Sequence, residues 1–336
     1  MKRFFLIMVT WLTLMATITP LALAKSGQQE KRGLAIILSG GPGLFNGGDW
    51  NGMIKDWKTF FLAQADNPQE GFYWPEIKSG VGFGAEILYY FSDQLALGLS
   101  LEYWKKKNQG QINLTSSNQE QGIIDSYPYE YSLESSLAFN SSNTLSILPL
   151  TLSAYYFLPI NQHFQAFFKA GLVYYFGRLK STYDYVQEEN EELILYDPDD
   201  GSLLDSYLSE EKYTYGYSDR VKGQNLGFQG GMGLEIKVLP RLNFRLELVY
   251  RQADLKSWKG SGIESLTYKE RYGSVSTGFT ENTERESQSP SGRLAFITYS
   301  DGTSIIALGD LSEPDSRRAV IKLSGPVLRA GLKMRF

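Results

Sequence analysis

The last segment of the chain most constrains its fold. From Leu328 to Phe336, apolar residues occupy every second position, and Arg329, Lys333 and Arg335 lie between them. A period of two is typical of a β-strand with one apolar and one polar face. A soluble protein would have to cover that apolar face with a second layer of protein, whereas lipid covers it in a membrane. The segment therefore predicts a strand in a packed sheet or in a membrane.

The start of the chain predicts secretion. Lys2 and Arg3 precede an apolar stretch over 4–19, which Pro20 ends, and Ala22-Leu23-Ala24 has the small-x-small pattern of a cleavage site. We expect a signal peptide at 1–24 and a mature domain at 25–336. The alternative is an uncleaved membrane anchor, since the apolar stretch is long enough to span a bilayer.

Segments with a period of two recur through the mature chain. In 95–105, for example, four leucines and Tyr103 alternate with Gly98, Ser100 and Glu102. Most such segments reach the length that a tilted membrane strand needs. The expected strands are 33–41, 77–91, 95–105, 144–157, 164–178, 225–238, 242–251 and 320–336.

The connections between these strands alternate in length. Three are short (92–94, 159–163 and 240–241), and four are long (45–76, 106–143, 179–223 and 252–319). Short turns at one rim and long loops at the other are typical of outer-membrane barrels. The sequence therefore predicts an all-β fold: an eight-stranded antiparallel up-and-down transmembrane β-barrel with short periplasmic turns and long extracellular loops. A soluble eight-stranded barrel, with its apolar faces inward, is the alternative.

The strand pattern carries a resemblance to a known group of proteins. A final apolar strand that ends on Phe336 resembles the C-terminal signal by which outer-membrane barrels are recognised for assembly. The architecture resembles the small eight-stranded outer-membrane proteins (the membrane domain of outer membrane protein A, outer membrane protein X and outer membrane protein W). This resemblance covers the strands, less than half of the chain. It implies the outer membrane of a Gram-negative-type cell, periplasmic termini, and outer-membrane lipid, lipopolysaccharide and the barrel assembly machinery as partners.

Charged residues are expected inside this barrel. If the apolar faces meet lipid, the alternate positions point into a lumen that side chains can just fill. Buried charges are tolerated only when they are paired, so we expect a lumen plugged by ion pairs, with a narrow ion path as the alternative. The candidate network comprises Glu86, Glu102, Lys169, Glu235, Arg245, Glu247, Arg251, Arg329, Lys333 and Arg335.

The first long loop contains a predicted helix over 49–65, with Asp49 as its N-cap. Its apolar stripe could face the outer lipid headgroups as an interfacial helix, or it could pack against the loops or across the barrel mouth. The stripe, at helical spacing, consists of Trp50, Ile54, Trp57 and Phe61.

Two later loops contain expected hairpins with Asp-Gly turns, over 193–203 and 294–308, which predict a raised extracellular collar. Within the first hairpin, 197–201 is expected to be a turn and not a calcium loop, because Leu208 stands where a calcium loop needs glutamate. The acidic residues of 179–223 are expected to face solvent, with divalent-ion bridging to lipopolysaccharide as a weaker alternative.

Composition excludes several functional classes. The chain has no cysteine, so disulfides and thiol catalysis are excluded, and its net charge of −4 argues against nucleic-acid binding. The single histidine, His163, falls in a predicted periplasmic turn, and no metal or cofactor motif appears. We therefore expect a non-enzymatic outer-membrane protein that acts in structure or surface interaction and has an extracellular ligand for its loops. A small channel or a lateral conduit for ions or apolar solutes is the alternative, and a lipid-modifying enzyme is less favoured.

Overall fold

The computed structural model describes residues 33–64, 71–309 and 315–336, so the expected signal peptide lies outside the described residues. The prediction of an all-β, antiparallel fold is confirmed. The described ranges contain sixteen strands and one helix, and fourteen of the strands belong to one sheet. Among the described residues, no helix is long and apolar enough to cross a membrane.

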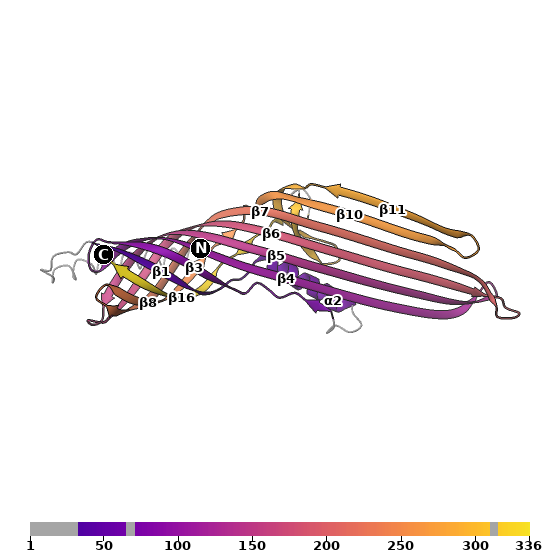
Figure 1. Ribbon diagram of the computed structural model, residues 1–336, viewed down its shortest axis with the longest axis horizontal. Helices are drawn as coiled ribbons and strands as arrows, with labels where there is room; N and C mark the ends of the chain where they lie inside the picture. The colour runs from indigo at the N-terminus through magenta and orange to yellow at the C-terminus, as the bar shows by residue number, and fades with distance from the viewer. Residues whose placement is uncertain (1–32, 65–70, 310–314) are drawn as a thin grey trace.

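Eight strands pair in a cycle, each antiparallel to the next, and the last returns to the first. We call this cycle the ring, and it overlaps every segment predicted as a strand. Figure 1 shows β1, β3, β8 and β16 gathered at one end of an elongated molecule. In order, the ring contains β1 (Gly33–Leu44), β3 (Ser79–Tyr90), β4 (Leu95–Ile124), β5 (Tyr127–Pro159), β6 (Phe164–Tyr196), β7 (Leu203–Leu239), β8 (Leu242–Gln252) and β16 (Gly325–Arg335).

The predicted total of eight strands is wrong, because the long connections also form strands. Residues 106–143 and 179–223, expected as loops, pair almost throughout as continuations of β4, β5, β6 and β7. Figure 1 shows these four strands running far beyond the ring as one curved sheet, which we call the extension. Both faces of much of the extension are polar, so its sequence lacks the apolar alternation that marks the ring.

The last long connection, 252–319, widens the extension. Here β10 (Lys259–Ser274) pairs with β7 and with β11 (Gly278–Gln288). The two predicted hairpins are confirmed: β6 turns into β7, and β12 (Ser291–Thr298) turns into β13 (Ser304–Gly309). The expected strand at 320–336 is divided between β15 and β16. The short strands are β2 (Phe72–Tyr73), β9 (Asp254–Leu255), β14 (Ser316–Arg318) and β15 (Ile321–Lys322).

The outer face of the ring is apolar, and its inner face holds the charges. Along β4, Leu97, Leu99 and Leu101 are 41%, 52% and 49% exposed, whereas Ser100 and Glu102 between them are buried. The same alternation continues through the other ring strands. A soluble monomer rarely exposes a contiguous apolar patch of more than a few hundred Å². The outer face of the ring therefore requires an apolar environment.

The helix α2 (Asp49–Gln64) lies where the sequence predicts a helix, but the interfacial hypothesis for its stripe is wrong. Trp50, Ile54 and Phe61 are buried in protein, and the half-buried Trp57 stacks on Phe139 with 5.5 Å between ring centroids. The extension and the β12–β13 hairpin supply the apolar surface that covers the stripe. The sequence predicts the hairpin at 294–308 but a loop at 106–143, so it does not identify Phe139 as a partner of the stripe. The helix packs against β13 and against the extension.

Candidate functional site: an aromatic cleft above a charged interior

Nine of the ten predicted lumenal residues lie inside the ring and are at most 6% exposed. The exception is Arg335, whose half-exposed side chain lies at the short-turn rim, 3.7 Å from Asp93. The period of two places Arg335 on the inner face, but β16 ends at this residue, so its side chain reaches water. Arg335 is therefore not part of the buried network.

Glu247 on β8 is the centre of the buried network. It forms ion pairs with Lys169 on β6, with Arg245 at 2.7 Å and with Arg329 on β16 at 3.0 Å. Three cations from three strands thus share one carboxylate. Such buried charges are tolerated because each is paired.

The network continues in both directions from Glu247. Arg329 contacts Glu102 at 2.5 Å, and Glu102 also pairs with Arg251, toward the mouth of the ring. Toward the short-turn rim, Glu235 pairs with Arg245 at 3.5 Å and with Lys333. The remaining carboxylate, Glu86, accepts a hydrogen bond of 2.7 Å from the Tyr155 hydroxyl.

Two apolar clusters enclose these charges. One lies at the short-turn rim and includes Tyr90, Phe157 and Phe167. The other fills the mouth and includes Trp104 and Trp258. Aromatic rings also contact the cations directly, and the Arg245 guanidinium lies 3.9 Å from the centre of the Phe167 ring. The buried charge pairs thus lie between two clusters of buried apolar residues.

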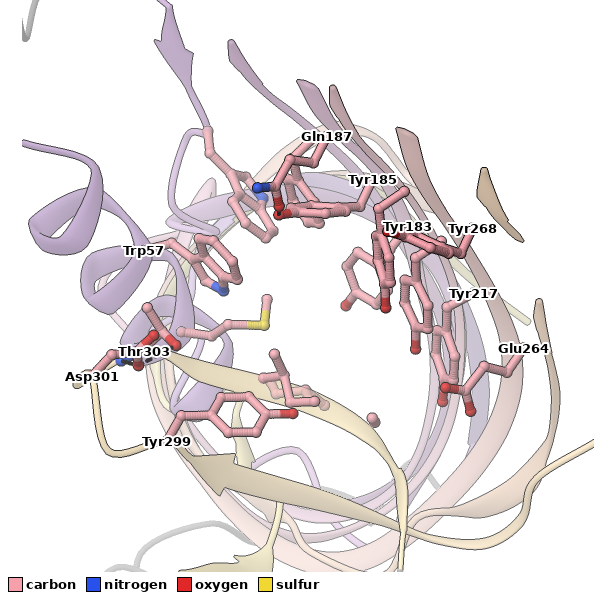
Figure 2. Close-up of a pocket in the computed structure, with 18 of the residues that line it drawn as sticks. Trp57, Tyr183, Tyr185, Gln187, Tyr217, Glu264, Tyr268, Tyr299, Asp301 and Thr303 are labelled. Carbon is pink, nitrogen blue, oxygen red and sulfur yellow. Dashed lines mark hydrogen bonds between the residues drawn. The ribbon is translucent and has the colours of Figure 1, made fainter. Parts of the chain in front are cut away.

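A cavity of about 670 Å³ lies above the mouth. Figure 2 shows it between α2, which supplies Trp57, the β12–β13 hairpin, which supplies Tyr299 to Thr303, and the concave face of the extension. The volume falls within the range of about 300–1,000 Å³ that is typical of small-molecule sites. We call this cavity the cleft.

Tyrosines from neighbouring strands line the cleft. Tyr183 on β6 stacks on Tyr217 of β7 with 5.8 Å between ring centroids, and Tyr185 meets Tyr213 edge to face at 5.8 Å. Figure 2 shows Tyr183, Tyr185 and Tyr217 pointing into the cavity. Sequence reasoning missed this wall, although Tyr213-Thr-Tyr-Gly-Tyr217 already has the period of two that turns tyrosines to one face of a strand.

Carboxylates complete the lining. Glu189, Glu211, Glu264 and Asp301 face the cavity, and neither lysine nor arginine is among its lining residues. Glu189 and Glu211 stand directly opposite each other in the β6–β7 ladder, an arrangement in which like charges repel. Within the described ranges, no cation lies within 4.0 Å of either carboxylate. The cleft therefore carries negative charge that no cation of the described residues neutralises.

A buried acid supports the tyrosine wall. The Asp219 carboxylate accepts hydrogen bonds of 3.1 Å from the Tyr217 hydroxyl and from the Ser181 backbone N–H. Burial raises the pKa of Asp219 to about 6, although these hydrogen bonds oppose the shift. Burial also raises the pKa values of Tyr183 and Tyr217, so both hydroxyls stay protonated at neutral pH. Tyr217 in turn accepts the Leu308 N–H at 2.8 Å, which ties the hairpin to the extension.

The described parts of the chain contain no candidate metal centre. No group of three or more His, Asp or Glu side chains there could hold a metal ion. Residues 197–201 form a turn, as expected: the Asp197 carboxylate accepts the Asp199 N–H at 2.8 Å, and Gly201 has a φ of +69°. His163 lies in the β5–β6 turn, where its backbone N–H donates to the Asn161 side-chain oxygen at 2.8 Å.

Comparisons with known proteins give only distant similarities. No family model and no curated protein matches the chain. A major outer membrane protein from Thermus thermophilus is 12% identical over 90% of this chain and 99% of its own, with a TM-score of 0.23. A mutant of the monoaromatic hydrocarbon channel TodX is 10% identical over 92% and 91%, with a TM-score of 0.18. A Pseudomonas aeruginosa FadL homologue is 10% identical over 91% and 90%, with a TM-score of 0.16. Similarities this low assign no function to the chain.

Proposed function

We propose that the protein is an integral outer-membrane β-barrel that binds organic cations at the cell surface. In this proposal the ring spans the bilayer with a closed lumen, and the extension holds the binding site outside the cell. The ligand class is inferred from the cleft, an aromatic cavity whose carboxylates have no cationic partner among the described residues.

The apolar face of the ring supports a position in the membrane. On β4 it runs from Leu95 to Tyr103, after which Lys105 and Lys107 are exposed. This length of tilted strand matches what a bilayer requires. Short turns at one rim and the extension at the other correspond to the periplasmic and extracellular sides of outer-membrane barrels.

The packed interior supports a closed lumen. Five cations and four carboxylates are buried between two apolar clusters, in a ring of a size that side chains fill. We therefore expect no steady unitary current when the purified protein is added to a planar bilayer. Steady single-channel steps would contradict the closed lumen and favour an ion path.

The chemistry of the cleft supports a cationic ligand with an apolar body. The faces of tyrosine and tryptophan rings attract cations, by about 2 kcal/mol or more where water is excluded. Glu189 and Glu211 are kept adjacent against their mutual repulsion, and a bound cation would relieve that repulsion. A site that violates a local stability rule in this way is expected to serve binding.

Calorimetric titration of the purified protein with benzyltrimethylammonium, and with neutral benzyl alcohol for comparison, tests this proposal. We expect the cation to bind more tightly than the alcohol. Glu189→Gln/Glu211→Gln is expected to weaken cation binding by about tenfold or more, and to stabilise the fold by about 0.2–1 kcal/mol because it removes a like-charge pair. A loss of binding without a loss of stability separates this effect from misfolding.

The matched control is Glu188→Gln, because Glu188 lies on the opposite face of the same strand and pairs with Lys212. This variant should bind the cation like the wild type. Equal binding by the double variant and the wild type would contradict the proposed site.

A second candidate function, a lateral conduit for apolar solutes, is favoured by an interruption in the wall. Along one edge, β7 pairs first with β10, up to Lys222–Lys259, and then with β8, from Phe228–Gln252 onward. Between these two ladders, 223–227 of β7 has no ladder partner on this edge among the described strands. The buried Trp258 fills this interruption from inside. If it is a gate, Trp258→Ala should speed the entry of an apolar dye into proteoliposomes, and an unchanged rate would exclude the conduit.

A further inference from the structure

A row of cations crosses the outer face of the sheet just beyond the apolar face of the ring. Residues paired across neighbouring strands lie on the same face, so the strand register defines this row. From β4 to β12 the paired positions are Lys105, Ser146, Arg178, Lys222, Lys259 and Arg293. All five cations are exposed.

A second row lies two residues farther from the ring. It contains Lys107 on β4, Lys180 on β6 and Arg220 on β7, again all exposed. We call the two rows the cationic band. It lies at the level where the apolar face of the ring ends, which is the headgroup level of the outer leaflet in the proposed membrane position.

The cationic band has no acidic partners in the described part of the chain. Among the residues that the structure describes, none of its eight cations has a carboxylate oxygen within 4.0 Å. On the outer face of the same strands, acidic residues such as Glu188 and Glu210 lie farther out along the extension. Cations paired directly across strands, such as Lys222 and Lys259, repel each other. An anion from outside the chain would remove this repulsion.

A groove of about 910 Å³ joins the band to the apolar face. Arg178, Lys222 and Lys259 lie on its cationic side, and Tyr103 and Phe176, which belong to the apolar face, lie on the other. Acidic side chains are not among its lining residues. A groove that is cationic at one side and apolar at the other fits a molecule with an anionic head and hydrocarbon chains.

We propose that the cationic band binds the phosphate groups of a phosphorylated lipid in the outer leaflet. Lysine and arginine bind phosphate through charge-assisted hydrogen bonds, and each basic residue near a membrane surface strengthens binding of an anionic lipid. A lipid is favoured over a soluble phosphate because the groove continues into the lipid-facing surface. The inference rests on the proposed membrane position of the ring.

The test measures which lipids the full-length protein binds in micelles that contain equal amounts of phosphatidylcholine and bisphosphorylated lipid A. Native mass spectrometry counts each bound lipid. We expect the wild type to prefer the phosphorylated lipid, and Arg178→Gln/Lys222→Gln/Lys259→Gln to reduce this preference on the order of 100-fold at low salt. All three side chains are exposed, so the variant should fold.

The matched control is Lys58→Gln/Lys269→Gln/Arg285→Gln, which removes three exposed cations outside the band. It should keep the wild-type preference. An unchanged preference in the band variant, an equal loss in the control, or displacement of the lipid by an equal concentration of inorganic phosphate would each overturn the inference. Flotation of the wild type with phosphatidylcholine vesicles tests the membrane proposal separately, since it does not depend on lipid phosphate.

Discussion

Glu247→Gln should strongly destabilise the ring, because Glu247 joins three buried cations. After this change Arg245 keeps Glu235 at 3.5 Å and Arg329 keeps Glu102 at 2.5 Å, but Lys169 loses the carboxylate of its ion pair. The interior then holds five cations and three carboxylates. Breaking a buried ion pair by removing one partner costs about 3–5 kcal/mol, and we expect a loss of that size here.

Urea unfolding in detergent micelles, followed by the fluorescence of the five tryptophans of 25–336, measures this loss. The matched control is Arg335→Gln, since that exposed pair with Asp93 should contribute no more than about 1 kcal/mol. Lys169→Met combined with Glu247→Gln should recover part of the stability, because the combination no longer leaves Lys169 buried without its carboxylate.

A loss of less than about 1 kcal/mol for Glu247→Gln would refute this reasoning. It would mean that water reaches the three cations and screens them, as in a hydrated path. The double variant would then be no more stable than the single one.

Three further predictions concern the extension and the mouth. The pKa of Asp219 rises from 3.8 to about 6 on folding, so protonated Asp219 stabilises the fold below about pH 4. As the pH rises through 6, the free energy of unfolding should fall by about 3 kcal/mol in total. In urea unfolding, Asp219→Asn should abolish this pH dependence. Gly177→Ala should lower the free energy of unfolding by about 1–3 kcal/mol, because the added Cβ would lie 2.6 Å from the Trp258 ring. In the same assay Gly230→Ala should lower it by less than half as much, because the nearest atom to its Cβ is 3.9 Å away. Amide hydrogens of 106–143 should exchange slowly because they pair between strands, and exchange as fast as in an unfolded peptide would contradict the extension.

The ring was predictable because apolar residues on its outer surface repeat at every second position. That period located all eight ring strands and turned residues such as Glu247 and Arg329 inward. The extension was less predictable, because polar residues occupy both faces over much of its length and the alternation of tyrosines at 213–217 is short. The stripe of α2 was identified, but its partner was not, since Phe139 lies in a segment expected to be a loop. The aromatic cleft was missed for the same reason.

Spin labelling along β4 tests the central claim, that the ring spans a membrane, most directly. The chain has no cysteine, so single cysteines placed in turn at 95–105 can each carry a label without a background signal. In phospholipid vesicles, labels at Leu97, Leu99 and Leu101 should be relaxed by oxygen, which concentrates in lipid. Labels at Gly98 and Ser100 should be relaxed weakly by oxygen and by a water-soluble nickel chelate, because they point into the packed interior. Strong relaxation by the nickel chelate at the leucine positions would place them in water and contradict the membrane-spanning ring.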